Sequence, residues 1–205
     1  MIVHVAVGKA AADGVNGTVK LDTWSADAEA TSVSGDWLLD TGSGSATIRG
    51  LRSGSVKLDT GSGDGVASDV SGDLLDIDTG SGDAEATNVQ VARFRFDTGS
   101  GNVRVTRVKA ARGGVDTGSG NVDLAYAEGP IDDLSIDTGS GHVDLSLPPQ
   151  ADVRLTVDAS NHDVMLERQG GIYERRNSDD GSVIRFGEGR GRVKIDTGSG
   201  RVTIR

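Results

Sequence analysis

The segment Asp97-Thr98-Gly99-Ser100-Gly101-Asn102-Val103-Arg104-Val105 contains the pattern that decides the fold. Its first five residues, Asp-Thr-Gly-Ser-Gly, occur seven times in the 205-residue chain. The copies begin at Asp40, Asp59, Asp78, Asp97, Asp116, Asp137 and Asp196. The first five intervals are 19, 19, 19, 19 and 21 residues, and the last is 59. A fixed period of this length predicts a stack of similar structural units.

Apolar residues alternate on both sides of each pentapeptide. With the aspartate as position 0, positions −3 and −1 carry pairs such as Phe94 and Phe96, and positions +6 and +8 carry pairs such as Val103 and Val105. A further apolar residue lies near position +11, as at Val108. A period of two is typical of strands with one buried face. Each repeat is therefore predicted to form a strand, a corner, a second strand and a second corner.

The predicted fold class is all-β. Nineteen residues are too few for two strands and a crossover helix, but they suffice for one coil of a parallel β-solenoid, or β-helix. We expect about ten rungs of 19–21 residues and a right-handed coil, as is usual for parallel crossovers. At ~4.8 Å per rung, the rod would be roughly 50 Å long.

The repeats divide the chain as a single solenoid domain, residues 1–205. Residues 1–13 are predicted to be an N-terminal edge or cap strand, and residues 14–169 to be regular rungs. Weaker pentapeptide copies at 158–162 and 177–181 occupy the long interval, and residues 170–191 are predicted to be an irregular rung or loop. Residues 192–205 would be the last rung, uncapped. Because an uncovered strand edge tends to pair with another chain, the C-terminal end is expected to be truncated, covered by residues 1–7 of another copy, or otherwise dimeric. The solenoid ends are thus the predicted sites of homo-oligomerisation.

The corner residues have a structural interpretation. In an Asx-turn, an aspartate side chain accepts a hydrogen bond from a backbone amide that follows it in the chain. Glycine permits positive φ where the chain bends. The threonine hydroxyls, beginning with Thr41 and Thr60, are expected to form hydrogen bonds along the stack. The seven aspartates would then form a structural turn ladder. A pair of apolar residues before Asp-Thr-Gly, as at Asp40, also occurs in aspartic proteases, but that mechanism needs two carboxylates facing each other. A period of 19 predicts one column instead.

Composition excludes several classes of protein. The net charge of −10 argues against nucleic acid as a partner. The chain lacks cysteine, so it has no disulfide framework. No apolar run approaches the ~18 residues of a membrane span, which argues against direct membrane insertion. The first seven residues have neither the basic region nor the long apolar region of a signal peptide.

The repeats resemble those of a bacterial adhesin-type family of β-strand-repeat domains. The resemblance rests on DTGSGNVRV at 97–105, DTGSGHVDL at 137–145 and the Leu-Pro connection at 147–155, and it covers roughly residues 14–205. It implies a single-chain β-helix in proteins of the cell envelope or the extracellular space, with an adhesin-like role.

Outward-facing positions +5 and +7 are predicted to form an acidic stripe that Arg104 and Arg201 interrupt. It is interpreted first as a solvated surface and second as a stripe that binds a partner or, weakly, calcium. Its members are Asp27, Glu29, Asp64, Asp83, Glu85, Asp123, Asp144 and Asp163. At position −2 a partly basic strip contains Lys20, Lys57, Arg95, Arg175 and Lys194. His142 and His162, on successive predicted rungs near Asp144 and Asp163, are weak candidates for a metal site.

Three functions remain open from the sequence. The first is a non-enzymatic scaffold or adhesin-like domain that presents a long face to a repetitive surface polymer or protein, without a cofactor. The second is a structural module that polymerises or dimerises through its end strands. The third, an enzyme or a carbohydrate-processing β-helix, is disfavoured by the scarcity of aromatic residues and by the lack of an acid/base pair outside the repeats.

Overall fold

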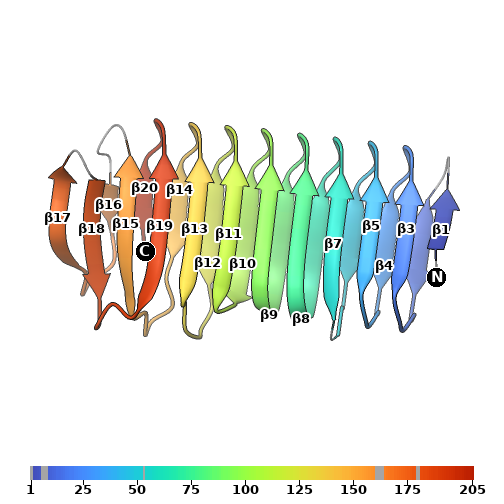
Figure 1. The fold of residues 1–205 in the computed structure, drawn as a ribbon, viewed down its shortest axis with the longest axis horizontal. Coiled ribbons are helices and arrows are strands. Elements are labelled where there is room, and N and C mark those ends of the chain that lie inside the picture. The colour runs from blue at the N-terminus through green and yellow to red at the C-terminus, as the bar shows by residue number, and fades with distance from the viewer. Residues whose placement is uncertain (1, 6–8, 53, 160–163, 179–180) are drawn as a thin grey trace.

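The computed structural model describes residues 2–5, 9–52, 54–159, 164–178 and 181–205. All the strands assigned in these residues belong to one sheet that coils into a rod, with the DTGSG corners along the upper edge in Figure 1. The strands in front rise and those behind descend while the chain advances from right to left, which makes the coil right-handed (Figure 1). The predicted all-β parallel solenoid is confirmed.

The front side of the rod, which faces the viewer in Figure 1, stacks the strands that lead into the DTGSG corners. In spatial order from the N-terminal end these are β1 (Ile2–Val5), β3 (Val19–Thr23), β5 (Trp37–Thr41), β7 (Ser55–Thr60), the second halves of β8 (Gly65–Thr79) and β9 (Ala84–Thr98), β11 (Arg112–Thr117), β13 (Asp133–Thr138), β19 (Gly191–Thr197) and β15 (Val153–Ala159).

The rear side stacks the strands that leave those corners. In the same order they are β2 (Ala10–Asp13), β4 (Ala28–Thr31), β6 (Ala46–Arg49), the first halves of β8 and β9, β10 (Val103–Lys109), β12 (Val122–Tyr126), β14 (Val143–Ser146), β20 (Val202–Ile204) and β16 (Val164–Leu166). On both sides, neighbouring strands of the solenoid are parallel and pair equivalent positions. Asp40 lies beside Asp59 on the front side, and Val103 lies beside Val122 on the rear side. Residues 1–13, predicted to be an edge strand, supply both strands of a first rung.

The core lies between the front and rear sides. Positions −3, −1, +6, +8 and +11 point inward in most rungs, and their side chains are buried. Phe94 and Phe96 stack with ring centroids 5.1 Å apart. In the next rung Gly113 occupies position −3, where a Cβ would collide with the ring of Phe94. Each buried Val or Leu contributes roughly 1.5–3 kcal/mol, and only neighbouring rungs supply that burial.

The lower corner, opposite DTGSG, is formed by a residue in the left-handed conformation at position +10. The residues there and their φ values are Ser32 (54°), Gly50 (71°), Asp69 (54°), Asn88 (55°) and Arg107 (58°). At this corner strands β8 and β9 remain single strands, and their pairing skips Asp69 and Asn88 and resumes at Val70 and Val89. The sequence pattern placed an apolar corner here but did not reveal this conformation, because only one of the five residues is glycine.

The C-terminal rung does not lie at the end of the rod, which corrects the prediction of an uncapped last rung. Strand β19 pairs with β13 on one side and with β15 on the other, and β20 likewise lies between β14 and β16. The rung made of residues 191–204 is thus inserted between two rungs that precede it in sequence (Figure 1). The predicted cover by residues 1–7 of another copy is not needed at this edge.

An antiparallel hairpin covers the end of the front side. Strand β18 (Gly181–Phe186) pairs with β15, and β17 (Ile172–Ser178) pairs with β18, both antiparallel. Residues 172–178 and 181–186 therefore form two antiparallel strands rather than an irregular rung or loop, and the described residues 177, 178 and 181 of the weak pentapeptide copy belong to these strands. The reversal of direction follows because the chain must return to insert its next rung behind β15.

Candidate functional site

Each DTGSG corner is closed by its threonine. In the rung of Thr98, the side-chain Oγ1 accepts a hydrogen bond from the Gly101 amide at 3.0 Å and donates one to the Gly82 carbonyl of the preceding rung, also at 3.0 Å. Thr117, Thr138 and Thr197 repeat both bonds. These threonines are buried. The predicted hydroxyl ladder is confirmed, and the threonine accepts the downstream amide that was assigned to the aspartate.

The two glycines of the corner have a different role from the predicted one. None of the DTGSG glycines has positive φ. Each lies directly over the previous rung instead: a Cβ on Gly99 or Gly101 would come closer than 3.0 Å to the carbonyl oxygen of Gly80 or Gly82. Glycine is needed because successive corners stack backbone on backbone.

The seven DTGSG aspartates form one half-exposed column on the front side. Register pairs Asp59 with Asp78 and Asp97 with Asp116, so these carboxylates are stacked neighbours and do not face each other across a groove. Cations at position −2 neutralise part of the column: Lys20 lies 3.2 Å from both Asp22 and Asp40, Lys57 lies 2.9 Å from Asp59, and Arg95 lies 2.7 Å from Asp97.

Asp116 lies where the cation strip is interrupted. The residues at position −2 beside Asp116 and Asp137 are Gly114 and Ser135. Partial burial, followed by repulsion from Asp97 and Asp137, raises the pKa of the Asp116 carboxyl, and Arg95 opposes the shift. The column therefore carries unneutralised charge at its middle.

The +5 members of the predicted acidic stripe form hydrogen bonds between rungs. The Oδ1 atoms of Asp27, Asp64 and Asp83 each accept a hydrogen bond from a backbone amide of the next rung. The donors are the amides of Ser45, Asp83 and Asn102, respectively. Asn102 and Asn121 continue the same ladder through their side-chain oxygens. A short side chain with an oxygen acceptor is thus required here to satisfy the next backbone amide, which explains the alternation of Asp, Ser and Asn.

The +7 members lie on the rear side, where cations are close to Glu29, Glu85 and Asp144. Glu29 accepts a hydrogen bond from Arg49 and forms an ion pair with Lys9. The pKa of the Glu29 carboxyl is lowered, and the hydrogen bond with Lys9 is the largest cause. Along the same column Arg104 lies between Glu85 and Asp123, at 3.8 Å from the Glu85 carboxylate. The stripe is therefore of mixed charge on the rear side, in agreement with the predicted interruption at Arg104.

Asp144 belongs to the same column on β14, where it lies beside Thr203 of the inserted rung. One of its carboxylate oxygens contacts Arg205, and the other is buried without a hydrogen-bond partner among the described residues. Burial raises the pKa of this carboxyl, and Arg205 opposes the shift. The remaining stripe member, Asp163, lies outside the described residues.

Of the predicted two-histidine metal site, the structure describes His142 and Asp144. Strand β20 lies between β14, which follows His142, and β16. The Nδ1 atom of His142 accepts the Arg201 amide at 2.9 Å, so this histidine continues the +5 ladder. His162 and Asp163 themselves lie outside the described residues. Among the residues that are described, no three His, Cys, Asp or Glu side chains are grouped to hold a metal ion.

Comparison with known proteins gives a family. The Toastrack family model, DUF4097, matches residues 16–205. The chain belongs to the Toastrack family. No curated protein and no solved structure matches it. As a Toastrack domain, it is a β-solenoid scaffold, and its described part has no helix with the length and hydropathy of a membrane span.

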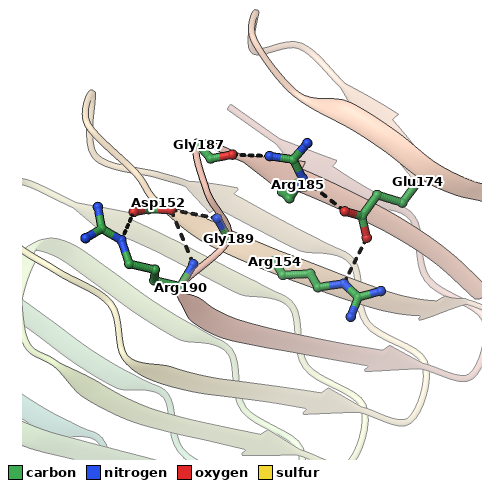
Figure 2. Close-up of polar contacts among 7 residues, drawn as sticks. All are labelled: Asp152, Arg154, Glu174, Arg185, Gly187, Gly189 and Arg190. Atoms are coloured by element: carbon green, nitrogen blue, oxygen red, sulfur yellow. Dashed lines mark hydrogen bonds and ion pairs between the residues drawn. The ribbon is translucent and has the colours of Figure 1, made fainter.

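At the C-terminal end, polar contacts hold the inserted rung of the Toastrack solenoid in place (Figure 2). Asp152 Oδ1 accepts the amides of Gly189 at 2.7 Å and Arg190 at 3.3 Å, while Oδ2 contacts the Arg190 guanidinium. These bonds, with that to Arg190 first, lower the pKa of Asp152. Glu174 lies between Arg154 at 2.9 Å and Arg185 at 3.0 Å.

Sequence reasoning missed this network, since its partners lie outside the repeats. Asp152 and Arg190 are 38 residues apart and share no motif. The one available signal was the clustering of prolines. All three prolines of the chain, Pro130, Pro148 and Pro149, line a cleft of 810 Å³ beside Asp152 and Arg190. The cleft lies where the link from β14 to β15 passes the inserted rung.

Proposed function

We propose that this Toastrack domain is a non-enzymatic scaffold that presents the rear side of its solenoid to a partner built of regularly repeated units. The observation that carries this proposal is the register of the rear strands, which stacks outward residues of the same position in straight columns. Side chains in such a column recur at ~4.8 Å. Many weak contacts at fixed spacing sum to a firm attachment when the partner has its own repeat.

The chemistry of the rear side favours a polar polymer at a cell surface, in line with the resemblance to adhesin-type domains. The +7 column combines both signs of charge, as at Glu85, Arg104 and Asp123. The neighbouring +9 column carries hydroxyls at Ser68, Thr87 and Thr106. The scaffold role is further supported by the Asp-Thr-Gly-Ser-Gly groups, whose threonines bond between rungs and several of whose aspartates contact Lys or Arg.

Retention on an array of polysaccharides and cell-wall fragments tests the proposal. The triple variant Glu85→Ala, Arg104→Ala, Asp123→Ala removes the centre of the +7 column and is expected to lose retention while keeping its melting temperature within a few degrees. The matched control, Arg95→Ala, alters the front side and is expected to be retained like the parent. Failure of the parent protein to bind any repetitive polymer, or equal retention of the triple variant, would refute it.

Weak calcium binding to the acidic stripe stays a prediction. If calcium binds, millimolar calcium should raise the melting temperature of the parent protein. The substitutions Asp83→Asn and Glu85→Gln should make that rise smaller. Unchanged melting in calcium would remove it.

Assembly through the end strands is the second candidate. The available edges are β1 and β2 at one end and β17 and β16 at the other, since β19 and β20 are enclosed. Filaments that form without ligand and disappear when Lys and Pro are placed in β1 would favour it over the scaffold.

A further inference from the structure

The inserted rung occupies a slot whose two walls are adjacent in sequence. One wall is the rung of β13 and β14, the other is the rung of β15 and β16, and residues 147–152 link them. This link crosses two rung steps instead of one, because β19 and β20 lie between. The slot is therefore built from one continuous segment and filled by another.

The bonds between slot and rung are the same as those between any two rungs. Thr197 donates to the Gly141 carbonyl at 3.1 Å, Arg201 donates its amide to His142, and Val193, Ile195, Val202 and Ile204 are buried. On both sides the strands pair in register. The slot thus recognises a DTGSG rung by contacts that do not depend on which chain supplies it.

A short turn connects the inserted rung to the rest of the fold. Residues 187–191 join β18 to β19, and Gly187 and Gly189 adopt φ of 62° and 73°. Asp152 and Arg185 hold this turn through the Gly189 amide and the Gly187 carbonyl. Opening this turn, together with breaking the strand pairing on both sides of the rung, would free residues 191–204 from their slot. Short hinges of this kind favour exchange of an element between copies.

We propose that the slot between β13/β14 and β15/β16 accepts the residue 191–204 rung of a second copy of this chain, which gives a rung-exchanged dimer. The exchanged dimer keeps every contact between rung and slot, and it differs from the monomer at the 187–191 hinge. This interface uses the strand edges that face each other across the slot, whereas the proposed binding surface uses the outward side chains of the rear side and end-to-end assembly uses the outer edges of the end strands.

Cysteine cross-linking in the full chain tests the exchange, because the natural sequence has no cysteine. Ser135 and Lys194 are exposed register partners on β13 and β19. Parallel neighbours at ~4.8 Å lie within the Cα separation that a disulfide needs. A chain with Ser135→Cys and a differently tagged chain with Lys194→Cys are co-expressed and oxidised. A disulfide between them requires the rung of the second chain to lie in the slot of the first.

The expected result is a covalent heterodimer from this pair that is absent from a control pair of Ser135→Cys with Arg95→Cys, an exposed residue of the same side on β9. Deleting Glu188 and Gly189 should increase the heterodimer several-fold, and inserting four Gly/Ser residues in the hinge should decrease it. Placing both cysteines in one chain should give a cross-linked monomer. No heterodimer above the control, in either the natural or the shortened hinge, would overturn the proposal.

Discussion

At the scale of single residues, the DTGSG corner depends on close backbone stacking. Glycine at positions +2 and +4 leaves room for the carbonyl of the rung beneath, and threonine at +1 links two rungs through a single hydroxyl. The left-handed conformation that was expected of the DTGSG glycines occurs instead at the opposite corner, where Asp69, Asn88 and Arg107 adopt it.

The stacking can be tested with Gly101→Ala. The added Cβ would collide with the Gly82 carbonyl, so we expect the free energy of unfolding to fall by about 1–3 kcal/mol, as for other overpacked sites. Urea denaturation measures it. The control is Gly114→Ala in β11, where a Cβ meets nothing within 4 Å and φ is not positive. We expect no loss there, and equal destabilisation by both substitutions would contradict the stacking argument.

At the scale of elements, columns of equivalent side chains decide the electrostatics of the rod. A Lys or Arg at position −2 offsets the repulsion between stacked aspartates. This repulsion is not offset in the same way where Gly114 and Ser135 occupy position −2. Partial desolvation, followed by repulsion from the neighbouring carboxylates, raises the pKa of Asp116 in the folded state. The ionised form of this residue therefore opposes folding.

This predicts the direction of a pH effect. Because the folded pKa lies above the unfolded value of about 3.9, the favourable contribution of Asp116 is complete below that value and is lost as the pH rises through the folded pKa. We expect Asp116→Asn to melt at a higher temperature than the parent at pH 7, and the difference to shrink as the pH falls towards 4. Asp97→Asn, which loses the contact with Arg95 at 2.7 Å, should not be stabilised. A less stable Asp116→Asn at pH 7 would disprove the assignment.

At the scale of the whole molecule, the solenoid is a sum of rungs in one register. Neighbouring rungs pair Asp78 with Asp97 and Ile77 with Phe96, so one full repeat can be removed without changing which side chains face the core. Each rung contacts only its neighbours, which is the property that makes repeat proteins tolerant of changes in repeat number.

Deletion of residues 78–96, one 19-residue repeat, tests this additivity. The shortened chain is expected to fold with an unchanged β-type circular dichroism spectrum, a lower melting temperature and a rod shorter by ~4.8 Å in solution scattering. A deletion one residue smaller, 79–96, shifts the register and turns core residues outward. It should be far less stable. Equal stability of the two deletions would contradict the register.

The amino-acid sequence by itself determined the repeat, the strand periodicity, the parallel solenoid and the threonine ladder. Each of these is local, because a 19-residue period with alternating apolar residues can bury its core only by stacking. Sequence reasoning could also place the acidic residues at position +5 on the outside. Their hydrogen-bond donors, the backbone amides of the next rung, became known from the structure.

Only the tertiary structure decided the order of the last rungs and the contacts that depend on it. Equivalent rungs offer the same hydrogen bonds and apolar faces, so the register alone cannot choose which rung lies beside which. Pairing of Asp152 with Arg190, and of Arg205 with both Asp144 and Glu167, becomes visible only in three dimensions. Sequence distance is a guide to neighbours along a regular solenoid, and it fails where the chain turns back and inserts itself.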